Sequence, residues 1–247
     1  MSAPGHPAGW ESIQRPSAPP NDCIDLYWCV LGGPADAESR PSSLLSADEL
    51  GRAQRMEPAT AARFVRRRAA LRQILGRCLG QPPQSLCFAY GPQGKPRLEG
   101  SRVSFSLAQR GDVVLLALGQ GAALGVDLEQ ALPRADALAI AESYFSAADV
   151  AALRDQPPAA RLATFYRAWT RREAIVKADG RGVGLPLDSF DVLGAAPLAD
   201  SAWSQCSAGG ATWHWRDVPV GAGWHAALAA SEPRAVRGWW LAANTLG

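Results

Sequence analysis

Two short segments hold the residues whose types and spacing could do chemistry. Asp127 and Glu129 stand in the apolar stretch "ALGVDLEQ", which is typical of a strand. Residues two apart on a strand project from the same face, so these carboxylates can point at one place. Trp169, Glu173 and Lys177 follow at four-residue spacing in "WTRREAIVKADG", which is typical of a helix. Residues four apart share a helix face, so a third carboxylate lies beside an ammonium.

Three carboxylates and one cation favour Mg²⁺ chemistry on a phosphate ester. Mg²⁺ prefers oxygen ligands and leaves coordination positions open for water and substrate phosphates. The histidines His6, His214 and His225 have no zinc-ligand spacing. Each segment alone is weak evidence, because strand-end acids are often only solvated and a helical Glu–Lys pair contributes about 0.3–0.5 kcal/mol. The prediction therefore depends on both segments together.

The composition narrows the class of protein. The net charge of +2 gives no argument for nucleic-acid binding. Five cysteines without C-x-x-C spacing indicate neither a disulfide framework nor a zinc knuckle. No apolar run is long enough for a secretory signal or a membrane span. We therefore expect a cytoplasmic protein that binds neither nucleic acid nor membrane.

Lysine is rare in this chain. Only Lys95 and Lys177 are lysines among 25 basic residues. The bias towards arginine could reflect genome composition alone. However, an ammonium is a compact point charge and a guanidinium a planar fork, so a site that needs the former resists replacement by arginine. Lys95, in the turn "GPQGKP", is therefore a further candidate for a binding residue.

The order of patterns predicts an α+β fold. Each half reads as helices and a small antiparallel sheet, so we expect two similar α+β subdomains in a pseudo-twofold arrangement. Ser46 and Ser146 are predicted helix N-caps, and Gly80 and Gly180 are predicted helix stops. Strands are expected at 24–31, at three places within 103–129, and as three or four antiparallel strands from "LDSFDVL" to "WWLAA". The expected division is a disordered tail at 1–20, an N-terminal subdomain at 21–125 and a C-terminal subdomain at 126–247.

The motifs, taken in order, resemble a known family. "GVDLE" followed by "WTRREAIVKADGRGVGLPL" is similar to the 4'-phosphopantetheinyl transferases of the larger, monomeric, surfactin-synthetase-activating (Sfp-like) type. The resemblance extends over "RFVRRRAALRQILG", "GKPRL", "VSFSLAQRGD", "YFSAAD" and "LDSF". It implies transfer of 4'-phosphopantetheine from coenzyme A to a serine of an apo acyl or peptidyl carrier protein, with release of adenosine 3',5'-bisphosphate.

The resemblance also implies roles for the first set of residues. Asp127, Glu129 and Glu173 would be Mg²⁺ ligands that hold the coenzyme A pyrophosphate. Glu173 would also be the general base, taking the proton of the carrier serine directly or through a water. Lys177 would neutralise charge on the pyrophosphate as the P–O bond breaks.

Further positions would bind the rest of coenzyme A. Lys95 matches a position that contacts its nucleotide end, and Arg55 and Arg68 match basic positions near its 3'-phosphate. Gln109 stands where the family commonly has a phosphate-binding histidine; it can donate a hydrogen bond but brings no charge. Arg110 could compensate for that charge.

Two other matters stay open from the residues alone. Arg172 replaces a lysine usual in the family, and we expect only a modest effect because the charge is kept. The run Arg63–Arg72 reads either as a solvated helix face or as a surface that steers an acidic carrier protein.

Rival functions remain. One alternative is a catalytically weakened homologue that only binds a carrier protein or coenzyme A, for which Gln109 is the best evidence. An unrelated phosphate-binding enzyme using "GPQGKP" is disfavoured because G-x-x-x-x-G-K-[ST] is absent.

Overall fold

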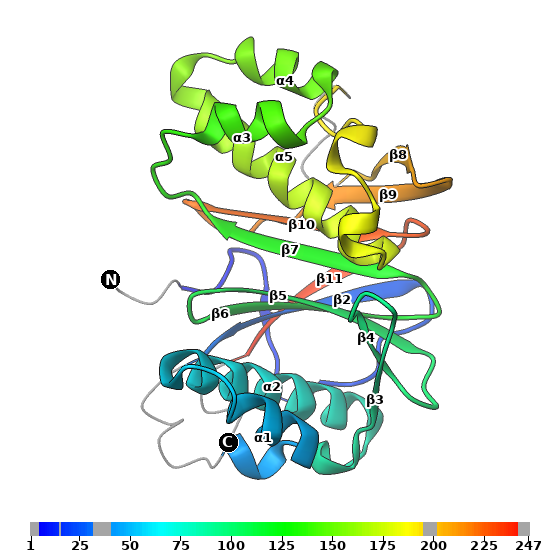
Figure 1. Ribbon diagram of the computed structural model, residues 1–247. Helices are drawn as coiled ribbons and strands as arrows, with labels where there is room; N and C mark the ends of the chain where they lie inside the picture. The colour runs from blue at the N-terminus through cyan, green and yellow to red at the C-terminus, as the bar shows by residue number, and fades with distance from the viewer. Residues whose placement is uncertain (1–4, 15, 32–40, 195–201, 242–247) are drawn as a thin grey trace.

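Two β-sheets lie face to face between two helical layers (Figure 1). The computed structural model describes residues 5–14, 16–31, 41–194 and 202–241. The five-stranded sheet has the order β1 (Glu11–Ser12), β11 (Ala235–Leu241), β2 (Cys23–Val30), β6 (Val113–Gln120), β5 (Val103–Arg110). The four-stranded sheet has the order β7 (Leu124–Gln130), β10 (Trp224–Ala230), β9 (Ala211–Asp217), β8 (Ser204–Ala208). A separate hairpin pairs β3 (Phe88–Tyr90) with β4 (Pro96–Leu98).

Helices cover the outer face of each large sheet. One layer holds α1 (Ala47–Ala53) and α2 (Pro58–Leu79), and the other holds α3 (Ala137–Tyr144), α4 (Ala147–Arg154) and α5 (Pro158–Asp179) (Figure 1). Short 3₁₀ segments follow α2 and α5: η3 (Pro83–Ser85), η4 (Gly182–Gly184) and η5 (Leu187–Ser189). The α+β class predicted from the sequence is confirmed.

Local sequence signals set the helix ends. The Ser46 hydroxyl accepts a hydrogen bond from the Glu49 N–H at 3.3 Å, and the Glu49 carboxylate accepts one from the Ser46 N–H at 3.0 Å. Both long helices end at a glycine in the left-handed conformation, Gly80 with φ 64° and Gly180 with φ 85°. Only glycine adopts that conformation without steric cost, so the predicted N-cap and stops are confirmed.

The two sheets share one apolar core. Trp28 and Leu115 from the five-stranded sheet meet Val126 and Leu228 from the four-stranded sheet in one buried cluster. Two other clusters pack α2 against the five-stranded sheet and α5 against the four-stranded sheet. Strands buried on both faces need apolar residues at every position, which explains the unbroken run "VVLLALG" of β6. The two halves of the chain therefore share a hydrophobic core between their sheets.

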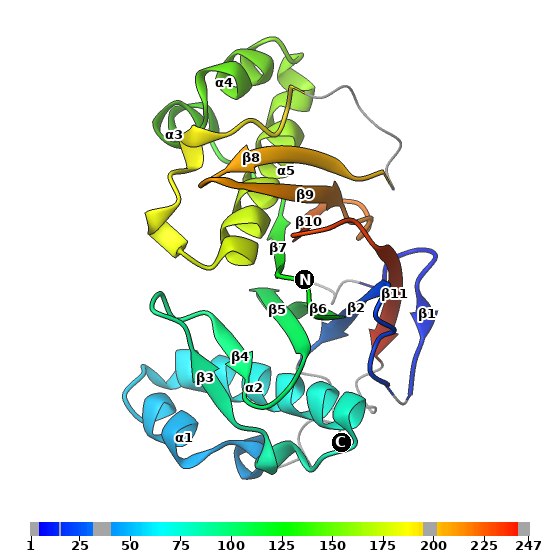
Figure 2. The same cartoon turned by 90° about the vertical axis from the view of Figure 1, so that its right-hand side faces the viewer.

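The C-terminal strand differs from the expected arrangement. β11 pairs in parallel with β2, with Trp239 opposite Tyr27, and so belongs to the sheet of the N-terminal half (Figure 2). The segment "LDSF" forms the 3₁₀ turn η5 instead of a strand, and the first strand of this region is β8. Alternating patterns predict strands but carry no information about distant pairing, so a boundary at 125/126 does not separate the two sheets.

The described part of the tail 1–20 is packed, in contrast to the expected disorder. Glu11 and Ser12 pair with β11, and the His6 ring stacks on Trp240 with centroids 4.5 Å apart. Trp10 lies on Gly238, where a Cβ would come within 2.6 Å of the indole. Aromatic contacts to the distant β11, which the tail sequence does not reveal, order these residues.

Within the described residues, no helix combines the length and apolarity needed to cross a membrane. Among the described residues the five cysteines form no disulfide; Cys29 and Cys78 are buried and Cys87 is exposed.

Candidate active site

The contact between β7 and α5 sets the position of the predicted acids. A Cβ at Gly125 would lie 1.9 Å from the Ala174 carbonyl oxygen and 2.4 Å from the Ala178 nitrogen. Only glycine allows strand and helix backbones to approach this closely. The glycine of "GVDLE" and the alanines of α5 therefore bring Asp127 within reach of Lys177.

Asp127 and Lys177 form an ion pair across this contact. Lys177 Nζ lies 2.7 Å from Asp127 Oδ1. The second oxygen, Asp127 Oδ2, is buried and has no hydrogen-bond partner among the described residues. A buried acceptor without a partner costs free energy, so this oxygen is suited to a ligand that is added later.

Burial and nearby charges shift the pKa values of the other two acids, Glu173 and Glu129. Burial raises the pKa of Glu173, and the negative charges of Asp127 and Glu129 raise it further, while Lys177 opposes them. Burial also raises the pKa of Glu129, against the Arg110 guanidinium, whose Nε lies 3.3 Å from Glu129 Oε2. Asp127 and Glu129 therefore lie close enough to Glu173 for their negative charges to raise its pKa.

The acids fit a hard cation in chemistry. No three His, Cys, Asp or Glu side chains among the described residues are gathered into a ready-made metal cluster. The donor set nevertheless consists of carboxylate oxygens, one of them buried without a partner, and a dication would relieve their repulsion. The metal-ligand role of Asp127, Glu129 and Glu173 stays a prediction.

A cavity of about 420 Å³ lies beside Lys177 and is bounded by both halves. Of the predicted site residues, Arg68, Lys95, Glu173 and Lys177 line it. Its volume is in the range of small-molecule sites. Asp127 contacts the lining through Lys177, whereas Glu129, Arg55 and Gln109 are not among the lining residues.

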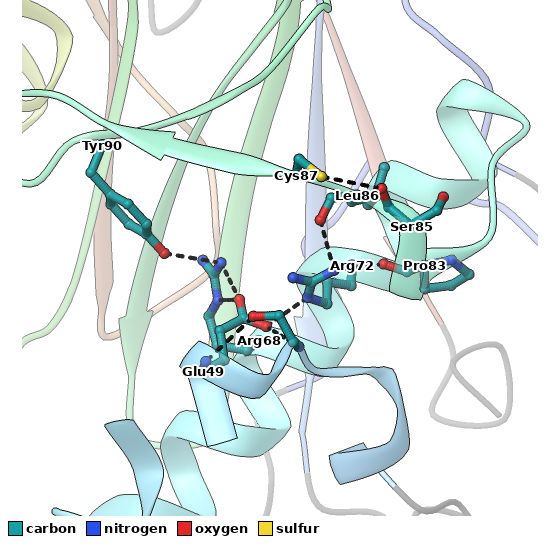
Figure 3. A network of polar contacts seen from close by, with 9 residues as sticks. Glu49, Arg68, Arg72, Pro83, Ser85, Leu86, Cys87 and Tyr90 are labelled. Atoms are coloured by element: carbon teal, nitrogen blue, oxygen red, sulfur yellow. Dashed lines mark hydrogen bonds and ion pairs between the residues drawn. The ribbon is translucent and has the colours of Figure 1, made fainter. Parts of the chain in front are cut away.

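A buried network fixes the predicted phosphate ligand Arg68 (Figure 3). Arg68 Nε donates to Glu49 Oε1 at 2.5 Å, and Arg72 Nε donates to Glu49 Oε2 at 2.7 Å. Burial alone would raise the pKa of Glu49, but the Ser46 N–H and the two guanidiniums hold it below its usual value. Arg68 and Arg72 are therefore internal ion-pair partners and not part of a solvated face.

Two arginines not predicted from the sequence line the cavity without a carboxylate partner among the described residues. The Arg52 guanidinium lies 5.5 Å from the centre of the Phe64 ring, and that of Arg67 lies 5.7 Å from it. Burial lowers the pKa of Arg67, as do the charges of Arg68 and Arg52. Nothing in the sequence separates Arg52, which lines the cavity, from Arg55, which does not, or Arg67 from Arg68, because the difference arises from which helix face meets the hairpin.

This use of the arginines reduces the surface proposed for an acidic carrier. Of the run Arg63–Arg72, Arg63 is exposed, and Arg66 is partly exposed and lies 3.6 Å from Asp112. The other arginines of the run belong to the cavity or to the Glu49 network.

Gln109 and Arg110 make contacts outside the cavity. Gln109 Nε2 donates to the Gly111 carbonyl at 2.9 Å, within the turn between β5 and β6. Arg110 pairs with Glu129. Compensation for the missing histidine by Arg110 stays a prediction. In this structure the Arg110 guanidinium forms an ion pair with Glu129.

Trp169 and Arg172 belong to the core of the C-terminal half. Trp169 packs on Phe165, with centroids 6.0 Å apart, and is not among the cavity-lining residues, so it does not extend the face of Glu173 and Lys177 into a cleft. Arg172 is fully buried; it donates to Asp149 at 2.5 Å and to the Leu187 carbonyl at 3.0 Å. Donation to several acceptors at once suits the planar guanidinium of arginine, which explains why an arginine stands at this position.

Comparison with known proteins identifies relatives that share one family description. Residues 123–229, which include β7 and α5, match the model of the 4'-phosphopantetheinyl transferase superfamily. A Synechocystis protein provisionally named as a 4'-phosphopantetheinyl transferase is 37% identical over 178 residues, covering 70% of this chain and 71% of the relative. The 4'-phosphopantetheinyl transferase HetI of Nostoc is 34% identical, with 67% and 74% covered. The 4'-phosphopantetheinyl transferase of Bacillus subtilis is 26% identical, with 68% and 76% covered.

This chain therefore belongs to the 4'-phosphopantetheinyl transferase superfamily, as its motifs predicted. It is an enzyme of that class, and membership implies coenzyme A and a carrier protein as its substrates.

Proposed function

We propose that this enzyme transfers 4'-phosphopantetheine from coenzyme A to a serine of an apo acyl or peptidyl carrier protein in a Mg²⁺-dependent reaction that releases adenosine 3',5'-bisphosphate. The observation that supports this most is the cavity, because one wall carries Arg52 and Arg67, which have no carboxylate partner among the described residues, and the other carries Glu173 and Lys177. A molecule with a phosphate at one end and a reactive pyrophosphate in the middle suits both walls.

The nucleotide end of coenzyme A is assigned to the arginine wall. Within the described part of the chain no carboxylate pairs with the guanidiniums of Arg52 and Arg67, whereas Arg68 already pairs with Glu49. Guanidinium forks bind phosphate oxygens in pairs, so these two arginines are the proposed ligands of the 3'-phosphate, with Arg68 holding the wall in place.

The pyrophosphate is assigned to the acidic wall. Asp127, Glu129 and Glu173 would hold Mg²⁺ there, and the ion would supply charge that stabilises the phosphoryl oxygens and the leaving group. Lys177 adds a second positive charge from the adjacent turn of α5. Its present bond to Asp127 keeps the ammonium directed to this place.

Glu173 is the proposed general base. Burial and neighbouring acids raise its pKa, which makes the carboxylate more basic, and no described residue donates a hydrogen bond to it. The serine oxygen forms a bond to the phosphorus that carries pantetheine while its proton passes to Glu173. The bond from that phosphorus to the bridging oxygen breaks, and its electrons leave with adenosine 3',5'-bisphosphate.

A mass measurement tests the reaction. Incubation with coenzyme A, Mg²⁺ and an apo carrier is expected to add one phosphopantetheine to the carrier, and the gain is expected to disappear with a chelator or in Glu173→Gln. Glu142→Gln removes an exposed carboxylate on α3 that pairs with Arg154 and serves as the control. No gain with any of several carriers would contradict the proposal.

Gln109 is the reason to test for a non-catalytic homologue as well. Such a protein would bind adenosine 3',5'-bisphosphate in a calorimeter but would leave every carrier unmodified. Retention of three neighbouring acids argues against it, since acids that repel one another have no use without a cation.

The type and setting of the enzyme form part of the proposal. A monomer of the larger Sfp-like type is supported because both walls of the cavity come from one chain. Cysteines that form no disulfide among the described residues agree with a reducing cytoplasm. Light scattering at micromolar concentration tests the monomer.

A further inference from the structure

The β3–β4 hairpin needs an anchor outside itself. Its two strands have three residues each and pair with neither large sheet. A two-stranded hairpin of this length is marginal in water by itself. Phe88 and Leu98 anchor the base of the hairpin in the core beneath it. The tip, residues 91–95, lies beyond those contacts, next to the segment that follows α5 (Figure 2).

Lys95 connects this tip to the opposite half. Its ammonium donates to the Leu124 carbonyl at 3.1 Å and to the Ala178 carbonyl at 2.7 Å. Leu124 begins β7, and Ala178 lies in the last turn of α5. One side chain therefore joins three segments that are far apart in the sequence.

The chemistry of this contact favours an ammonium. The carbonyl groups in the last turn of a helix accept no hydrogen bond from an N–H of the same helix, and this end of the helix carries partial negative charge. Asp179, one residue further along, adds its charge in favour of the cation. Gly180 leaves room for the lysine stem, since a Cβ there would lie 3.0 Å from Lys95 Cδ.

We propose that Lys95 is a positioning residue: its ammonium fastens the β3–β4 hairpin to the junction of β7 and α5 and thereby fixes the distance between the two walls of the cavity. The hairpin contributes Tyr90 and Gln93 to the lining, and α5 contributes Glu173 and Lys177. Loss of the fastening therefore lets one wall move relative to the other.

Hydrogen exchange in the ligand-free protein tests the fastening without any assay of activity. The Gly91 N–H donates to the Lys95 carbonyl at 2.9 Å, so exchange in a peptide covering 88–98 reports opening of the hairpin. In Lys95→Met, exchange of this peptide is expected to be about tenfold faster, because a charge-assisted hydrogen bond is lost. Exchange of the α2 peptide is expected to be unchanged. Unchanged exchange at 88–98 would overturn the proposal.

Three further variants separate the fastening from other effects. Arg97→Met removes an exposed charge from the same hairpin and is expected to leave exchange unchanged. Lys95→Arg keeps two donors for the two carbonyls and is expected to restore most of the protection. Gly180→Ala keeps the ammonium but crowds its stem, and is expected to accelerate exchange at 88–98. Failure of Lys95→Arg to protect better than Lys95→Met would count against the fastening.

The consequence for catalysis rests on the proposed function. Lys95→Met is expected to lower kcat by about 10- to 100-fold, since small displacements of reacting groups carry such costs, with partial rescue in Lys95→Arg. Weaker binding of adenosine 3',5'-bisphosphate with unchanged kcat and unchanged exchange would instead identify Lys95 as a direct nucleotide ligand. If no variant or wild-type protein transfers phosphopantetheine, the exchange result still decides the role of Lys95.

Discussion

Arginines of one helix are used in two different ways in this protein. Arg68 and Arg72 are buried against Glu49, whereas Arg67, in the same turn, lines the cavity and pairs with no carboxylate of the described residues. A buried carboxylate between two guanidiniums organises the surrounding backbone, because Arg72 also donates to the carbonyls of Pro83 and Leu86 (Figure 3). The free donors of the neighbouring arginine are then available for an anion.

The first prediction concerns Glu49. Glu49→Gln leaves two buried guanidiniums without a counter-charge, so we expect a loss of about 3 kcal/mol in the free energy of unfolding, measured by urea denaturation. Asp48→Asn, in the same turn but exposed, is expected to cost less than about 1 kcal/mol. Equal effects would show that the Glu49 network contributes little.

The second prediction concerns the phosphate ligands. Arg52→Gln and Arg67→Gln are each expected to weaken coenzyme A binding by about tenfold, in line with the loss of one charged hydrogen bond. Binding of dephospho-coenzyme A, which lacks the 3'-phosphate, is expected to change little. Arg55→Gln removes an exposed arginine close to Arg52 in sequence and serves as the control in the same calorimetric titration. A larger effect in Arg55→Gln than in the other two would refute our assignment.

At the scale of elements, the packing of β7 on α5 carries the site. The two backbones meet at Gly125. Two residues further along β7, on the same face, Asp127 contacts Lys177. Sequence patterns predicted both elements and their ends, since caps, stops and apolar periodicity are local. They did not predict that Arg172 and Trp169 face away from the cavity, because a helix pattern alone does not say which stripe meets which neighbour.

The third prediction tests that packing. Gly125→Ala places a methyl 1.9 Å from the Ala174 carbonyl, so strand and helix must separate. We expect a loss of about 1–3 kcal/mol in stability by calorimetry and a loss of transfer activity, because Asp127 moves relative to Lys177. Gly51→Ala, in α1, has its nearest neighbour 3.8 Å away and is expected to be neutral or slightly stabilising. Wild-type stability and activity in Gly125→Ala would mean that the contact is adaptable.

At the scale of the molecule, the two halves are joined more closely than a pair of subdomains would be. β11 returns to the N-terminal sheet, one apolar core lies between the sheets, and Lys95 connects the hairpin to α5. The cavity is therefore a property of the whole fold.

The fourth prediction is a pH dependence of global stability. Burial lowers the pKa of Lys95 to about 8 from its ordinary 10.5, with Asp179 opposing. Between these values the unfolded chain holds the proton more fully than the folded protein, so the contribution of Lys95 to stability rises with pH over this window. Below pH 8 both states are protonated and the contribution is constant.

Urea denaturation of wild type and Lys95→Met between pH 7 and 11 measures this contribution as a difference. We expect wild type to gain stability relative to the variant as the pH rises. A difference that is flat or falls would show that the folded protein holds this proton at least as tightly as the unfolded chain does.

The sequence by itself determined the α+β class and the helix ends, because caps and periodicity act over a few residues, and its motifs identified the superfamily by resemblance. The contact of Asp127 with Lys177 joins residues of β7 and α5 and depends on their packing. Only the tertiary structure decided that β11 crosses to the other sheet, that Arg52 and Arg67 face the cavity while Arg68 pairs with Glu49, and that the Lys95 ammonium contacts α5. These outcomes depend on partners that are distant in sequence, and the free energy of such contacts is set by packing and burial, which no local pattern records.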